Sequence, residues 1–181
     1  QALQNFPGAP VEIFNSESVA MAMGFQVLMA ARAAKEGASL KECRQVAEQA
    51  KPLTGVVFAV DTLEFLHRGG RIGGGAKFLA TALDIKPILE IRDGRVEAVE
   101  RVRTRKKSLA RVVSLVEERM AGRKPVRLAT LHAKAEEDAR WLLEVGCAHL
   151  EPVEKIYTEV SPVVGTHAGP GTVGVAFLAG M

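Results

Sequence analysis

Thr166 and His167 lie in a stretch that differs from ordinary packing sequence. Residues 161–171 contain this hydroxyl and imidazole together with two prolines and the glycines Gly165, Gly169 and Gly171. Glycine permits close backbone approaches and proline stiffens a turn, so this stretch is interpreted as a rigid turn. Such a turn suits a small anionic group such as a carboxylate or a phosphate. A tight loop between strands also explains the glycines, but it does not explain the Thr-His pair.

A second glycine-rich stretch surrounds Arg71, with five glycines in residues 69–75. It is not a nucleotide-binding loop, because Phe78 follows Lys77 where a P-loop needs Ser or Thr, and its spacing does not fit a dinucleotide-binding loop. The glycines can still let the backbone bend around an anion or let another chain approach, and we expect the Arg71 guanidinium to be accessible. A flexible surface turn with solvated arginines is the alternative.

Residues 101–107 form a strongly basic segment, Arg-Val-Arg-Thr-Arg-Lys-Lys. If Thr104 is a helix N-cap, Arg105, Lys106 and Lys107 lie in the first turn, where each exposed cation costs on the order of a few tenths of a kcal/mol. This placement favours an acidic partner or a phosphate at that helix end. The alternative is a solvated basic face. Nucleic acid is a weaker interpretation, because no aromatic residues lie among the charges.

The remaining polar residues do not suggest catalysis. His67, His132 and His149 lack the spacing of metal ligands, and we expect them at the surface or at sheet edges. No serine lies in a nucleophile-elbow sequence. This inventory favours a binding protein over an enzyme and predicts no catalytic residue, no metal and no cofactor.

The composition is typical of a soluble globular chain of 181 residues, with 48% hydrophobic residues and a net charge of +3. No apolar run is long enough for a membrane span and no signal segment opens the chain, so we expect a cytoplasmic protein without stable membrane insertion. We expect Cys43 and Cys147 to be reduced thiols. Because the chain opens at Gln1 with a helix-like segment, we expect a fragment.

Helix and strand patterns alternate along most of the chain, which predicts an α/β fold with a mixed β-sheet covered by helices. Asp93-Gly94 predicts a hairpin, Asp61 is expected to cap a short helix, and Trp141 is expected to pack inward. A boundary near Thr54 divides residues 1–54, the end of a first α/β domain, from residues 55–181, a second one. Strands are predicted at 11–14, 55–60, 85–91, 96–102, 126–131, 156–160 and 173–178, and helices at 19–35, 39–52, 76–83, 104–120 and 136–145.

Five motifs run through the chain in order. They are VDTLEFL at 60–66, RGGRI at 68–72, IKPIL at 85–89, VRTRKK at 102–107 and GTHAGPG at 165–171. In this order and spacing the chain resembles the DegV family of bacterial fatty-acid-binding proteins, whose characterised members are the acyl-carrying subunits of fatty acid kinase. The resemblance implies two α/β domains with the acyl chain between them. It also implies that upstream segments, which in the family help to bind the carboxylate, are absent here.

The same resemblance implies roles for individual residues. His167 belongs to the hydrogen-bond network around the fatty acid carboxylate, and Thr166 and Gly165 shape that site. Arg71 and Arg103 match positions associated with contact to the kinase subunit. Asn15-Ser16 stands where many members have Asp-Ser, and no role is assigned to this pair.

The sequence thus predicts a fatty-acid carrier that presents a carboxylate to an ATP-dependent kinase for acyl phosphate formation. Its partners would be a long-chain fatty acid and the kinase subunit, with transient membrane contact and no nucleic acid. One alternative is an enzyme that acts on a phosphorylated or carboxylated small molecule with His167 as acid or base. Another is a regulatory nucleic-acid-binding module that uses the basic helix end.

Overall fold

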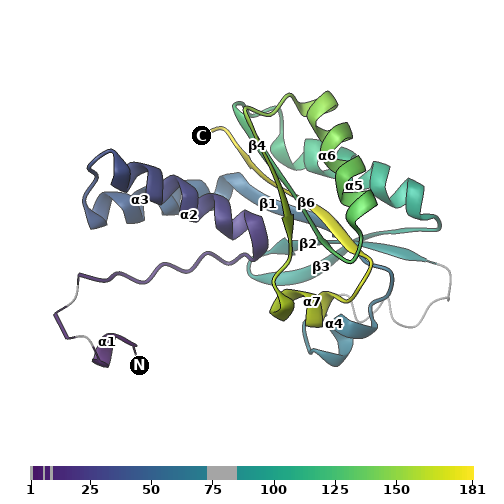
Figure 1. Cartoon of the computed structure of the whole chain (residues 1–181), viewed down its shortest axis with the longest axis horizontal. Coiled ribbons are helices and arrows are strands. Elements are labelled where there is room, and N and C mark those ends of the chain that lie inside the picture. Colours follow the sequence, from purple (N-terminus) through teal and green to yellow (C-terminus); the bar gives the residue numbers. More distant parts are fainter. Residues whose placement is uncertain (1, 6, 9, 73–84) are drawn as a thin grey trace.

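The computed structural model describes residues 2–5, 7–8, 10–72 and 85–181. These residues form a six-stranded mixed β-sheet with helices packed on it (Figure 1). Only β4 and β5 pair in parallel; the other neighbours are antiparallel. The predicted α/β fold with a mixed sheet is therefore confirmed. In spatial order the strands are β3 (Arg95–Val102), β2 (Lys86–Arg92), β1 (Thr54–Ala59), β6 (Thr172–Ala179), β4 (Val126–Ala133) and β5 (Glu154–Glu159).

The two central strands are buried on both faces, as the unbroken apolar run at 55–60 predicts. Side chains alternate between the faces of a strand, so β1 contributes to two separate cores. Val57 packs in the core on one side of the sheet, and Val56 and Phe58 pack in the core on the other.

Each core is covered by its own helices (Figure 1). On one face lie α5 (Arg105–Met120) and α6 (Glu136–Leu150). On the other face α2 (Ala20–Lys35) packs against β1, β4 and β6, and α3 (Leu40–Ala50) packs on α2. The smaller helices are α1 (Ala2–Asn5), η1 (Lys51–Leu53), α4 (Glu64–Arg68) and α7 (Pro162–Ala168), of which α4 and α7 contact each other.

Local sequence signals set several of these boundaries. The capping box is present at α3, where the Ser39 hydroxyl accepts from the Glu42 N–H and the Glu42 side chain bonds the Ser39 backbone. Thr104 caps α5 by accepting from the Lys107 N–H. Asp93 and Gly94 both have positive φ and join β2 to β3, as the hairpin signal predicts.

Three expectations about local structure are wrong. Val11–Phe14 forms no strand but runs as irregular chain. Leu63, and not Asp61, is the N-cap of α4. Trp141 is 37% exposed, because the buried positions of α6 follow a helical spacing, Ala139, Leu142 and Gly146, that excludes it.

His132 was expected at the surface or at a sheet edge. It is instead buried, at 2% exposure, on the inner strand β4. Its ring is satisfied by Tyr157, whose hydroxyl lies 2.8 Å from Nε2, and by the Ala135 N–H at 3.4 Å from Nδ1. The helix predicted at 76–83 lies outside the described residues. The domain boundary near Thr54 stays a prediction, and α2, which precedes it, packs on the sheet that follows it.

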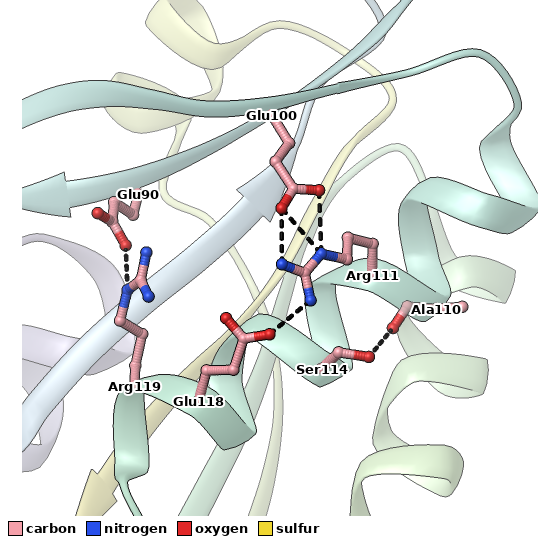
Figure 2. A network of polar contacts seen from close by, with 7 residues as sticks. All are labelled: Glu90, Glu100, Ala110, Arg111, Ser114, Glu118 and Arg119. Atoms are coloured by element: carbon pink, nitrogen blue, oxygen red, sulfur yellow. Dashed lines mark hydrogen bonds and ion pairs between the residues drawn. The ribbon is translucent and has the colours of Figure 1, made fainter.

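Two arginines tie α5 to the outer strands of the sheet (Figure 2). The Arg111 guanidinium donates to the Glu100 carboxylate on β3 at 2.6 to 3.0 Å. It also donates to Glu118, which lies further along α5, at 2.7 Å. Arg119 Nε donates to the buried carboxylate of Glu90 on β2 at 2.8 Å. These bonds fix the position of α5 against the sheet.

Candidate functional site

A pocket of about 890 Å³ opens on the sheet face that carries α2. Its floor is apolar and comes from strand side chains that also belong to this core, including Val56 and Phe58 on β1 and Leu131 on β4. Ile91 and Val96, which face each other across β2 and β3, extend the floor toward the sheet edge. This volume and lining are typical of a site for a mostly apolar small molecule.

The rim of the pocket is polar. Arg71, Arg95 and His167 line it together with Ser16 and Ser18, and the acidic residues Glu17 and Asp93 are also part of the lining. Apolar floor and charged rim together suit an amphipathic molecule with an anionic head.

Residues 161–171 do not form the predicted rigid turn, because most of them form the short helix α7. Ser161 is its N-cap and accepts from the Val164 N–H, and Pro162 occupies the first turn, where a missing N–H costs nothing. Gly169 ends the helix with a φ of +83°. Pro162 and Gly169 thus mark the two ends of a helix, a use that the turn interpretation overlooked.

His167 lies in the last turn of α7 and lines the pocket. Its Nδ1 is buried and has no hydrogen-bond partner among the described residues. Gly69 makes this position possible, since a Cβ there would lie 2.3 Å from the same Nδ1. A neutral imidazole has one donor and one acceptor nitrogen, so the ring can offer a hydrogen bond to a ligand in the pocket.

Thr166 and Gly165 do not line this pocket. Thr166 is exposed, and its hydroxyl donates to the Pro162 carbonyl at 2.8 Å, one turn earlier in α7. Gly165 accepts from the Gly169 N–H at the end of the helix. The roles of all three residues toward a carboxylate stay predictions, and of the three only His167 lines the pocket.

Arg71 and Arg103 are both exposed, as expected, but only Arg71 lines the pocket. The Arg71 N–H donates to the Leu66 carbonyl and its Nη1 to the Gly69 carbonyl at 2.6 Å, which holds the guanidinium close to the end of α4. Arg103 precedes α5. The residues 73–75 of the glycine-rich stretch lie outside the described part of the chain.

The expectation that Arg105 needs an external acidic partner is wrong. Its guanidinium pairs with Asp138 at 2.7 Å and donates to the Gly171 carbonyl at 2.7 Å, so the fold itself supplies its partners. Lys106 and Lys107 are exposed, as a basic docking surface requires.

The segment around Ser16, for which no role was expected from the sequence, borders the pocket. Gln26, which is buried on α2, donates to the Ser16 carbonyl at 3.4 Å and to the Thr54 hydroxyl at 2.9 Å. Glu17 takes a positive φ of 49° and pairs with Lys51 at 2.8 Å. The serine-rich composition was the available signal, but only tertiary packing brings it to the pocket.

Two further properties hold for the part of the chain that is described. No group of three or more His, Cys, Asp or Glu side chains there is arranged to hold a metal ion. Within the same ranges, no helix is both long and apolar enough to cross a membrane.

Solved structures similar to this chain include two that are described as fatty-acid-binding. A DegV family protein from Thermus thermophilus superposes with a TM-score of 0.90 at 36% identity, covering 98% of this chain and 64% of that one. DegV from Bacillus subtilis, described as a fatty acid binding protein, superposes with a TM-score of 0.80 at 34% identity, covering 93% and 60%.

Sequence comparison leads to the same relatives. A DegV domain-containing protein of Streptomyces coelicolor is 38% identical over 167 residues, which are 92% of this chain and 59% of the relative. DegV of Bacillus subtilis is 36% identical over 165 residues, with shares of 91% and 59%, so this chain spans about three fifths of both relatives. The family model described as "Uncharacterised protein, DegV family" matches residues 1–180. The chain belongs to the DegV family.

Proposed function

We propose that this protein is a non-catalytic carrier of a long-chain fatty acid. The acyl chain lies on the apolar floor of the pocket, and the carboxylate meets His167 at its rim. The observation that carries this proposal is that His167 lines a large pocket whose floor is formed by apolar side chains of the sheet. The fatty-acid-binding descriptions of the Thermus and Bacillus relatives support it.

The energetics of such a carrier are favourable. A chain of about sixteen carbons, at about 0.8 kcal/mol per buried methylene, gains on the order of 12 kcal/mol before ordering costs, which is enough to take a fatty acid from a membrane during a transient contact. The carboxylate must keep its hydrogen bonds when it leaves water, or it would take up a proton. His167 and Arg71 are among the lining residues that can donate to it.

The proposal includes a cytoplasmic, ATP-dependent kinase as partner. A carboxylate oxygen would attack the γ-phosphorus of ATP, so that a new P–O bond forms an acyl phosphate while ADP leaves, and the kinase would supply nucleotide and magnesium. Arg103 is exposed and lies outside the pocket lining, so it is suited to contact a partner rather than the lipid. Arg71 lines the rim, where head group and partner would meet.

Mass spectrometry of an organic extract tests the carrier. The protein should be purified at the length that its gene encodes, from two expression hosts, and extracted in parallel with a His167→Ala variant. We expect a long-chain fatty acid in about one-to-one ratio with the wild type and less in the variant. Extracts from both hosts without fatty acid would refute the carrier.

The kinase partner needs a separate test. We expect Arg103→Ala to retain fatty acid binding but to lose acyl phosphate formation with the cognate kinase. Lys155→Ala, which removes an exposed cation from the edge strand β5, is the matched control and should behave as the wild type. Normal turnover of Arg103→Ala would remove this residue from the proposed interface.

A further inference from the structure

A charged cluster, formed by Asp61, Lys86, Arg105 and Asp138, lies beside the connection between α7 and β6. Arg105 Nε donates to Asp138 Oδ2 at 2.7 Å, and Lys86 Nζ donates to Asp61 Oδ1 at 3.0 Å. Arg105 Nη1 approaches the same Asp61 oxygen at 3.8 Å. Two cations and two carboxylates balance each other, so the cluster carries no formal net charge.

Both backbone polar groups of Gly171 make hydrogen bonds, one of them to the cluster. Arg105 Nη2 donates to the Gly171 carbonyl at 2.7 Å, while the Gly171 N–H donates to the Ala133 carbonyl at 2.8 Å. Gly171 has a φ of +79°, and a Cβ at this position would lie 2.0 Å from Asp61 Oδ2. The backbone of Gly171 is therefore held by two hydrogen bonds, and Asp61 occupies the space that a side chain would take.

The position of Gly171 bears on His167, four residues earlier. The helix α7 has seven residues, and its C-terminal end leads directly through Gly169 into this connection. Gly169 is packed against Phe65, since a Cβ on it would lie 2.3 Å from the Phe65 ring. An anchor at Gly171 thus fixes the end of α7 that carries the imidazole.

We propose that Arg105 is a positioning residue for His167, which acts through Gly171 and does not touch the ligand. Arg105 does not line the pocket, and its side chain is 23% exposed. The inference rests on the proposed function, because it assigns Arg105 to recognition of the carboxylate end of the fatty acid. If Arg105 had only a structural role, its loss would weaken the binding of ligands with and without a carboxylate equally.

The test compares two probes that share a tail and differ in the head group. Hexadecanoic acid and hexadecanol displace a fluorescent fatty acid from the protein at its natural length. We expect Arg105→Gln to lower the affinity for hexadecanoic acid about tenfold, which is the equivalent of one hydrogen bond to a charged group. The affinity for hexadecanol should not change. Arg105→Lys keeps the charge and should recover part of this loss. Lys106→Gln, which removes an exposed cation from the same helical turn, should have no effect.

Imidazole nitrogen signals from NMR give a readout that does not need a ligand. The His167 signals, assigned with a His167→Gln variant, should shift in Arg105→Gln and stay in place in Lys106→Gln. If Arg105→Gln does not fold, Arg105→Lys decides by the same criteria. Equal losses for acid and alcohol, or unshifted His167 signals with unchanged acid affinity, would overturn the positioning role. If the wild type binds neither probe, the proposed function falls, and the His167 signals alone decide this inference.

Discussion

The imidazole of His167 depends on its immediate neighbours. Its Nδ1 is buried against Gly69, and the absence of a Cβ at Gly69 leaves the room that the ring occupies. Gly69 has an ordinary φ of −77°, so the backbone itself does not require glycine there. The glycine serves the close approach of the histidine, which separates its role from that of a turn residue.

Gly69→Ala tests this reading of the site. We expect the imidazole to be displaced, and the affinity for a fatty acid to fall by about tenfold, because one hydrogen bond to the carboxylate is lost. The unfolding free energy should fall by roughly 1–3 kcal/mol, because the buried imidazole must move although no backbone strain is added. Displacement of a fluorescent fatty acid and urea unfolding measure the two effects. Gly24→Ala in α2 is the control, and equal affinities for both variants would contradict the expectation.

Gly171 and Gly122 allow a second residue-scale prediction. Both have positive φ, +79° and +72°, but a Cβ would meet Asp61 at Gly171 and nothing within 4 Å at Gly122. Alanine at either position adds left-handed strain of about 1 kcal/mol. We expect Gly171→Ala to be destabilised by roughly 1–3 kcal/mol more than Gly122→Ala, because Asp61 and its ion pairs with Lys86 and Arg105 must move. Urea unfolding of both variants checks this difference, and equal losses would show that Asp61 yields freely.

At the scale of elements, local signals predicted most helices and strands, whereas the site needed tertiary information. The cap at Thr104 is local, and it was predicted. The helix α7 was missed, because Gly and Pro near its ends have the composition of a turn. The burial of His132 and the pocket position of Ser16 depend on which face each element turns inward, and one sequence does not record that choice.

The contact between α5 and β3 predicts a pH dependence (Figure 2). Hydrogen bonds from Arg111 hold the pKa of Glu100 below its ordinary value of 4.5. A lowered folded pKa adds stability above the unfolded value, and this stability is lost as the pH falls below about 4.5 toward the folded value.

Glu100→Gln should therefore lose stability at pH 7, by about 1 kcal/mol or less for a partly exposed pair. Below pH 4 its stability should approach that of the wild type. Urea unfolding at both pH values measures this convergence. A constant gap between the two proteins would mean that Glu100 titrates alike in the folded and unfolded states.

At the scale of the molecule, the sheet separates two hydrophobic cores, and the pocket lies on the side of only one of them. The core under α5 and α6 contains fully buried side chains such as Val112 and Leu142. The core on the α2 face borders the pocket, and several of its members, including Phe58 and Leu131, line it. The layer of α5 and α6 thus supports the sheet, and the layer on the α2 face borders the pocket.

This division predicts that stability and ligand binding can be changed independently. Val112→Ala, on the α5 face, should lower the unfolding free energy by roughly 1–3 kcal/mol and leave fatty acid affinity intact. Val96→Trp, a half-buried pocket position on β3, should fill the pocket and abolish binding of long acyl chains at little cost to stability. Urea unfolding without ligand and displacement of a fluorescent fatty acid measure the pair. If Val112→Ala weakened binding as strongly as Val96→Trp, the two layers would have to move as one unit, because a change behind the sheet would then reach the pocket in front of it.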